Sequence, residues 1–182
     1  MGRRPQPHLR EALLDACTDH ALEHGLPDRM GPLAAAAGTS TRMLVYHFGD
    51  RDTLLRAVLR RARERQLAVF GDLLRVRAGE AYPVTLQRAW DGISGAAGRP
   101  YLRIFGERRE GAVDELWPGF RQVATTDWLA PLHEGLGGPG PATLALAVIR
   151  GLLADLDATG DTARTDAAFG HFVALLGVDQ LG

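Results

Sequence analysis

Apolar residues recur at spacings of three and four along most of this 182-residue chain, and this periodicity constrains the fold more than any other feature. Such spacing places the apolar side chains on one face of an α-helix. β-Branched and aromatic residues never alternate with polar residues over a run long enough to indicate a strand. Hydrophobic residues make up 46% of the chain, which is enough for a sizeable buried core. We therefore predict an all-α fold.

Glycine, proline and capping residues divide the periodic segments into about nine helices. We expect them at about residues 7–24, 31–37, 41–47, 51–76, 84–96, 101–109, 119–136, 142–156 and 162–176. Cys17 lies on the apolar side of the first helix and is predicted to be a small buried core residue. Because it is the single cysteine, an internal disulfide is excluded.

The charged residues are distributed unevenly along the chain. Residues 1–67 include 11 arginines and 8 acidic residues, whereas the remainder includes 10 arginines and 14 acidic residues. This difference suits an N-terminal part that faces phosphate groups and a C-terminal part that does not. No segment approaches the run of about 20 apolar residues that a membrane helix needs. We therefore expect a cytoplasmic protein.

The segment 33–48 is typical of a helix-turn-helix, because two short helical patterns flank Gly38. In the second helix, Leu44 and Phe48 share the inward face, while Arg42 and Tyr46 share the outward face. A short surface helix with polar and aromatic outward positions suits a DNA major groove. Either Ser40 or Thr39 is expected to cap this helix.

The outward side chains have the chemistry that DNA recognition requires. An arginine at the start of an exposed helix, such as Arg42, can donate two hydrogen bonds to guanine, and Thr41 can contact a thymine methyl group or a phosphate. Tyr46 and His47 lie one turn later, at a reach that suits backbone phosphates. The first turn of the next helix carries Arg51, where free N–H groups already attract a phosphate. The candidate DNA-binding residues are Thr39, Ser40, Thr41, Arg42, Met43, Tyr46, His47 and Arg51.

The residues 45–55, preceded by 33–40, resemble the N-terminal domain of TetR-family transcriptional regulators. The close resemblance covers about residues 9–59, and the last two helices are similar to the dimerisation bundle of that family. The resemblance implies that Ser40 caps the recognition helix, that Thr41 and Arg42 contact bases, and that His47 contacts a phosphate. It also places Arg51 where the family usually has a phosphate-binding lysine.

One of two departures from the family pattern is the missing Ser or Thr cap before the second helix, at residues 29–31, and the other concerns a tyrosine. The family tyrosine aligns with Val45, which cannot donate a hydrogen bond to a phosphate, and the tyrosine of this chain is displaced by one position. Either Tyr46 makes the phosphate contact from a rotated direction or the contact is lost. We favour the contact by Tyr46, because the helical wheel places it on the outward face.

The resemblance implies two domains, a DNA-binding domain at residues 1–50 and a ligand-binding and dimerisation domain at residues 51–182. The second domain would enclose a small-molecule site whose occupation moves the DNA-binding domains. Large aromatic residues concentrate in its central helices, where they can line a pocket or fill a core. Few polar side chains lie among them, which favours an apolar or aromatic effector. The candidate ligand-binding residues are Trp90, Tyr101, Phe105, Trp117, Phe120 and Trp128.

The last two predicted helices carry more apolar surface than they can cover between themselves. The segment 142–156 is apolar almost all round, apart from Arg150 and Asp155. Pairing with the same two helices of a second chain makes a four-helix bundle, so we predict a two-fold homodimer rather than burial within a monomer. The candidate interface residues are Leu144, Val148, Leu152, Phe169, Phe172 and Leu176.

These features predict a DNA-binding transcriptional regulator. The resemblance implies a ligand-responsive repressor that binds a near-palindromic operator as a homodimer and releases it when a small molecule occupies the second domain. The alternatives are a helical dimeric enzyme and a binding scaffold without DNA affinity.

Little in the sequence favours an enzyme. The carboxylates of Glu107, Glu110, Asp114 and Glu115 are interspersed with arginines and indicate a solvated helix face. The one helical histidine pair has no third ligand at a clear spacing, so we expect no metal site, and no cofactor motif is present.

Overall fold

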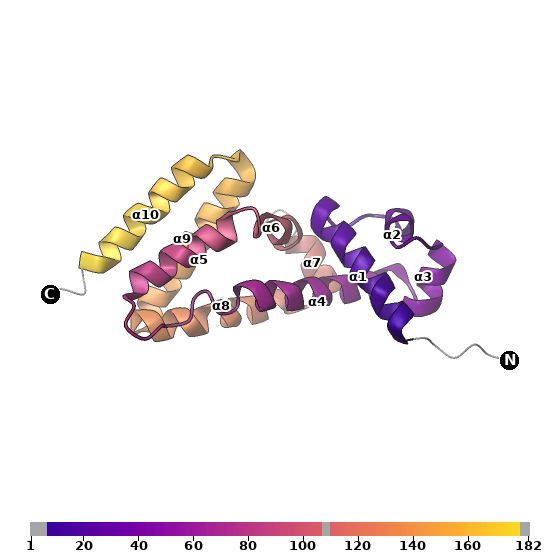
Figure 1. The fold of residues 1–182 in the computed structure, drawn as a ribbon, viewed down its shortest axis with the longest axis horizontal. Helices are drawn as coiled ribbons and strands as arrows, with labels where there is room; N and C mark the ends of the chain where they lie inside the picture. The colour runs from indigo at the N-terminus through magenta and orange to yellow at the C-terminus, as the bar shows by residue number, and fades with distance from the viewer. Residues whose placement is uncertain (1–6, 107–109, 179–182) are drawn as a thin grey trace.

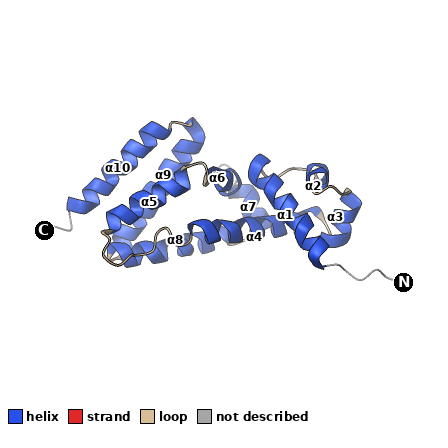
Figure 2. Cartoon of the chain, viewed as in Figure 1, coloured by secondary structure: helices blue, strands red, loops and turns tan. Residues whose placement is uncertain are grey.

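The computed structural model describes residues 7–106 and 110–178, which form ten α-helices and no strand. The prediction of an all-α fold is therefore confirmed. Figures 1 and 2 show α1–α3 at one end of the molecule, α5 and α8–α10 at the other, and α4 running between them. The helices are α1 (Pro7–His24), α2 (Met30–Ala36), α3 (Thr41–Phe48), α4 (Arg51–Phe70), α5 (Tyr82–Ser94), α6 (Arg99–Phe105), α7 (Glu110–Leu116), α8 (Phe120–Leu136), α9 (Pro139–Thr159) and α10 (Thr162–Val178).

The structure departs most from the predicted helices at the end of the fourth helix and at an additional helix, α7, and α9 is three residues longer at each end than predicted. The fourth helix ends at Phe70 and not near residue 76. Leu74 is still buried, but it packs from a turn, and its carbonyl accepts a hydrogen bond from the Tyr82 hydroxyl at 2.8 Å. Apolar residues beyond Phe70 thus keep a helical spacing without forming helix. The helix α7 was not predicted, and its buried Val113 anchors it to the core.

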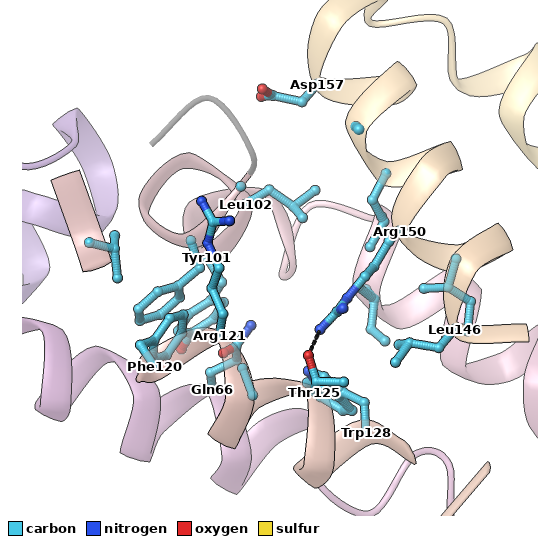
Figure 3. A pocket seen from close by; sticks show the side chains of 18 of the residues that line it. Gln66, Tyr101, Leu102, Phe120, Arg121, Thr125, Trp128, Leu146, Arg150 and Asp157 are labelled. Atoms are coloured by element: carbon cyan, nitrogen blue, oxygen red, sulfur yellow. Dashed lines mark hydrogen bonds between the residues drawn. The ribbon is translucent and has the colours of Figure 1, made fainter. Parts of the chain in front are cut away.

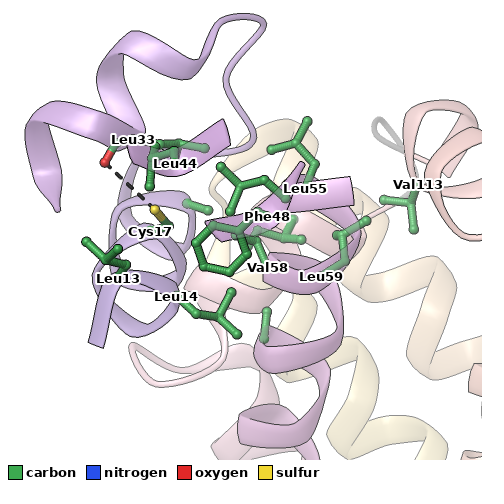
Figure 4. Packing of buried hydrophobic residues seen from close by; sticks show 14 of the residues in the cluster. Leu13, Leu14, Cys17, Leu33, Leu44, Phe48, Leu55, Val58, Leu59 and Val113 are labelled. Atoms are coloured by element: carbon green, nitrogen blue, oxygen red, sulfur yellow. Dashed lines mark hydrogen bonds between the residues drawn. The ribbon is translucent and has the colours of Figure 1, made fainter. Parts of the chain in front are cut away.

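We call α1–α3 and the N-terminal half of α4 the head. Its core combines apolar residues of all four helices, and the same cluster continues into the body through Ile104, Val113, Phe120 and Ala124 (Figure 4). Cys17 lies at its centre with no solvent exposure, as predicted, and its thiol donates to the Leu33 carbonyl at 3.8 Å. Burial raises the pKa of this thiol to about 11, which keeps it protonated. The labelled core residues in Figure 4 are Leu13, Leu14, Cys17, Leu33, Leu44, Phe48, Leu55, Val58, Leu59 and Val113.

We call the remaining helices, with the C-terminal half of α4, the body. Trp90 of α5 stacks on Phe169 of α10 with ring centroids 4.7 Å apart and planes 13° from parallel. The indole N–H of Trp90 also donates to Asp166 at 2.7 Å, so one residue fixes α10 against α5. None of the helices in residues 7–106 and 110–178 is both long and apolar enough to cross a membrane.

Candidate functional site

The turn between α2 and α3 is closed by a local hydrogen-bond pattern. The N–H of Thr39 donates to the Ala34 carbonyl at 2.9 Å, and the N–H of Gly38 donates to the Ala35 carbonyl at 3.1 Å. Gly38 has a φ of 60°, which glycine adopts without strain. The sequence therefore determines the angle at which α3 leaves α2.

Contacts at both ends hold α3 in place. The Ser40 hydroxyl accepts a hydrogen bond from the Met43 N–H at 3.2 Å, which confirms Ser40 as the cap. Leu44 and Phe48 are buried in the head core. The Arg10 guanidinium of α1 lies over the Phe48 ring, 4.7 Å from its centroid. The helix is therefore rigidly packed on its inner face.

The outer face of α3 is open to solvent. Thr41, Arg42, Met43 and Val45 are exposed, and Tyr46 is 62% exposed. Arg42 makes no hydrogen bond or ion pair with any residue in the described part of the chain. This is the arrangement that the helical wheel predicts, and it leaves a guanidinium and a phenol available to a partner.

Three other predicted residues are less accessible. Thr39 and His47 are half-buried, and the Nε2 atom of His47 is buried without a hydrogen-bond partner among the described residues. Arg51 is half-buried, and its guanidinium donates to the Pro27 carbonyl at 3.1 Å and pairs with Asp52 at 2.9 Å. Arg51 thus ties the start of α4 to the loop between α1 and α2.

A cavity of about 550 Å³ lies in the body, lined mainly by α4, α6, α8 and α9 and partly open to solvent. Aromatic side chains from α6 and α8 form one wall, and aliphatic side chains of α9 form another (Figure 3). The aromatic wall consists of Tyr101, Phe105, Phe120 and Trp128, and the aliphatic wall includes Leu146, Ile149 and Leu153.

Two of the six predicted ligand-binding aromatics do not line this cavity. Trp90 is only 1% exposed and belongs to the core between α5 and α10. Trp117 packs on the outer side of Phe120, with ring centroids 5.1 Å apart, beside the Arg60 guanidinium. Aromatic residue type alone does not distinguish a core position from a wall position, because both bury the ring.

The sequence reasoning missed the charged residues of the cavity wall. Arg63, Arg121, Arg150 and Asp157 line it together with the polar residues Gln66 and Thr125. A signal for Arg63 is present, because its charge interrupts the apolar stripe of α4. Likewise, Arg150 stands out as the one basic residue of the mostly apolar helix α9.

Arg63 is the most buried of these charges. Its guanidinium pairs with Asp127 at 2.6 Å, donates to Gln66 at 2.6 Å, and lies 5.4 Å from the centroid of the Trp128 ring. Its Nε atom is buried and has no acceptor among the described residues. A paired and hydrogen-bonded charge of this kind is tolerated in an interior.

The predicted interface residues lie on α9 and α10, at the end of the molecule away from α3 (Figure 1). Leu144 is 56% exposed, and Val148, Leu152, Phe172 and Leu176 are half-buried. Phe169 corrects the prediction, because it has no solvent exposure and stacks on Trp90 within the same chain. Leu175, which was not predicted, is also 56% exposed.

The residues considered for catalysis or metal binding do not form a cluster in the described part of the chain. Asp114 pairs with Arg121 at 3.0 Å, and Glu107 lies outside the described residues. The rings of His20 and His24 are 4.6 Å apart, but residues 7–106 and 110–178 contain no group of three side chains that suits a metal ion.

No family model matches the chain, and no curated protein matches it. Among solved structures, the chain is similar to a TetR-like transcriptional regulator from Rhodococcus sp. RHA1, with a TM-score of 0.67 and 23% sequence identity. The match covers 99% of this chain and 100% of that chain. The chain therefore has the fold of a TetR-like transcriptional regulator.

Proposed function

We propose that this protein is a DNA-binding transcriptional regulator whose helix α3 enters the major groove. The observation that carries the proposal is the contrast between the two faces of α3. Its inner face is fixed by a capped start and by buried Leu44 and Phe48, while Arg42 and Tyr46 extend into solvent. A rigid helix with exposed hydrogen-bond donors is what direct readout of base edges requires.

The exposed residues divide into base-reading and phosphate-binding positions. Arg42 lies in the first turn of α3, where a bidentate contact with guanine is within reach, and Thr41 and Met43 lie beside it. Tyr46 lies one turn later and takes the phosphate contact that Val45 cannot make. Arg51 uses two of its five donors within the chain, so others remain for a phosphate.

We further propose that the chain acts as a two-fold homodimer. Residues 1–50 would form the DNA-binding domain and residues 51–182 the ligand-binding and dimerisation domain. Leu144 and Leu175 are exposed on α9 and α10, and half-buried Val148, Leu152 and Leu176 extend this apolar surface. Burying it against the same helices of a second copy removes the patch and presents two heads to successive major grooves.

The cavity supplies a route from a small molecule to the head. Tyr101 and Phe105 of α6 line it, and Arg103 of the same helix donates to the carbonyls of Leu22 and Glu23 at the end of α1. A ligand that displaces α6 would therefore shift α1 and change the spacing of the two heads. We propose that occupation of the cavity releases a near-palindromic operator, so that the protein acts as a repressor.

The test is binding of the purified protein to the DNA fragment upstream of its own coding region, at two salt concentrations. We expect a footprint on a near-palindromic site and an affinity that falls steeply as salt rises, because phosphate contacts release counterions. A dimeric enzyme or a scaffold would give neither the footprint nor the salt dependence.

Two substitutions then separate the roles within the head. Arg42→Ala is expected to relax base preference at one position and to cost about 1–3 kcal/mol on the specific site. Arg51→Ala is expected to weaken binding to all sequences alike. Because Arg51 also bonds to Pro27, thermal unfolding of each variant is measured in parallel. Equal and sequence-independent losses for both variants would contradict this division.

A further inference from the structure

The cavity in the body is amphipathic, with several arginines among its described lining residues. Its described lining residues include three guanidinium groups, of Arg63, Arg121 and Arg150, and one carboxylate, of Asp157. The rest of the wall is mostly aromatic or aliphatic. Arg63 is buried, whereas Arg121 and Arg150 are exposed at the rim of the cavity, so a ligand that enters it meets guanidinium groups both inside and at the opening.

The carboxylates that pair with two of these arginines lie outside the cavity wall. Arg63 pairs with Asp127 and Arg121 pairs with Asp114, and neither aspartate lines the cavity. A ligand therefore approaches these pairs from their basic side. The buried Nε–H of Arg63 adds a donor that has no acceptor among the described residues.

Arg150 is the arginine that crosses the cavity. It rises from the aliphatic wall of α9, and its guanidinium donates to the Thr125 hydroxyl on α8 at 2.8 Å (Figure 3). A guanidinium and a hydroxyl that lie side by side can both donate to one carboxylate, and the bonds from the guanidinium are charge-assisted. Asp157 lies at the other end of the cavity in the same view, away from Thr125. The region around Thr125 thus suits an anion.

The aromatic wall supplies the other half of the recognition. Phe105 and Phe120 are stacked with ring centroids 5.0 Å apart, and Trp128 continues this surface on α8. Leu146, Ile149 and Leu153 line the cavity from α9. A flat ring or an alkyl chain placed between these two walls would bury most of its apolar surface.

We propose that the cavity binds a small organic acid, with its carboxylate held by Arg150 and Thr125 and its apolar body between the aromatic wall and α9. The inference rests on the proposed function only in treating this ligand as the effector. It adds a charged end to the apolar or aromatic effector that the sequence favours.

The test compares probes that share one apolar body and differ in charge. Calorimetric titration of the full-length protein with 2-naphthoate, 2-naphthamide and 2-naphthylmethylamine gives three affinities for the same ring system. Decanoate and decanamide repeat the comparison with an alkyl body. We expect at least one acid to bind, and to bind tenfold or more tightly than its amide. Equal or tighter binding of the amides, or no binding of either acid at millimolar concentration, would overturn the proposal.

Variants assign the preference to the named residues. Arg150→Met keeps the length and apolar character of the side chain, and we expect a loss of tenfold or more for the acid with little change for the amide. Arg75→Met removes an exposed arginine outside the cavity and serves as the matched control. Equal losses for acid and amide in Arg150→Met would contradict the assignment. Thr125→Val gives a second, independent variant, expected to weaken acid binding by a smaller factor.

The two proposals fail in distinguishable ways. An acid preference in a protein that gives no DNA footprint would leave the ligand assignment intact and reject the regulator. A clear footprint combined with an amide preference would reject the ligand assignment alone.

Discussion

The head and the body use the same residue types but differ in how they place charge and space. In the head, Arg42 of α3 lies at the surface, and just beyond the head Arg61 and Arg65 of α4 form partly exposed ion pairs with Asp15 of α1. In the body, Arg63 lies two positions from both Arg61 and Arg65, yet it is buried beside the cavity. One helix, α4, thus carries surface charges toward α1 and an interior charge toward α8.

This difference teaches what each part is suited to do. The head core packs aliphatic side chains around the Phe48 ring, and it holds α3 by its inner face. By contrast, the body keeps about 550 Å³ open between its helices. Rigid presentation of α3 and deformability near α6 are the two properties that a ligand-controlled DNA-binding protein needs in separate places.

The largest loss in the free energy of unfolding should come from a substitution that opens a cavity in the well-packed core of the head. Phe48→Ala removes a buried ring under the Arg10 guanidinium, and we expect a loss of about 3–5 kcal/mol in the free energy of unfolding. Phe105→Ala removes a half-buried ring that already borders open space, so we expect about half that loss.

Urea unfolding at one fixed protein concentration measures both variants. DNA affinity is expected to disappear in Phe48→Ala near its unfolding midpoint and to persist in Phe105→Ala. Equal destabilisation by the two substitutions would show that the cavity wall is packed as tightly as the head core.

The next effect concerns helix packing in the body. Gly135 of α8 lies against the Tyr82 ring, and an added Cβ would stand 2.0 Å from the nearest ring carbon. We expect Gly135→Ala to cost about 1–3 kcal/mol, because the ring is held by its hydrogen bond to the Leu74 carbonyl. The control is Gly31→Ala in α2, where an added Cβ meets nothing within 4 Å.

For the control we expect no loss, and a gain of about 0.5–1 kcal/mol, since alanine is the better helix former. A stable Gly135→Ala variant would mean that α8 can move away from α5 without cost, which would make the body more deformable than its contacts indicate.

The head was easier to predict from the sequence than the body, because its signals are local. The features that define α3 lie within 11 residues of the chain, and short-range geometry determines each of them. They are the positive φ of Gly38, the cap by Ser40, and the inward Leu44 and Phe48. The first three helices were therefore placed to within one or two residues.

The body depends on contacts between residues far apart in the chain. Whether an aromatic ring fills a core or lines a cavity is decided by its partners, as Trp90 and Phe169 show by stacking on each other across 79 positions. The end of α4 at Phe70 depends in the same way on Tyr82, whose hydroxyl bonds the turn that follows. Helical periodicity contains no information about such pairings.

A smaller effect is expected from removing the cap of α3. Ser40→Ala leaves the Met43 N–H without its acceptor, and we expect a loss of about 1 kcal/mol in the free energy of unfolding. DNA affinity should fall further than stability, because the first turn of α3 carries Thr41 and Arg42. Thr126→Ala in the body removes a hydroxyl that bonds only to the preceding turn of its own helix, so it should leave stability nearly unchanged.

The smallest effect is a pH dependence in the body at the start of α5. Two hydrogen bonds from Arg88 and one from Thr85, all 2.7 Å long, hold the pKa of Glu80 at about 2, below its usual 4.5. Between these two values the unfolded chain binds more protons than the folded chain. This contribution to stability is therefore present above pH 4.5 and is lost as the pH falls toward 2.

The measurement is the difference in urea midpoint between pH 5.5 and pH 3, compared between the natural chain and Glu80→Gln. Other carboxylates also lose their charge in this range, so the natural chain shows a difference in urea midpoint that is not due to Glu80 alone. We assign to Glu80 only the amount by which Glu80→Gln makes this difference smaller. Glu115→Gln, at an exposed position with no ion pair among the described residues, should give the same difference as the natural chain. Because Glu80 and Arg88 remain partly exposed to solvent, screening keeps the effect below that of the buried substitutions. An unchanged difference in Glu80→Gln would mean that this ion pair orients α5 without stabilising it.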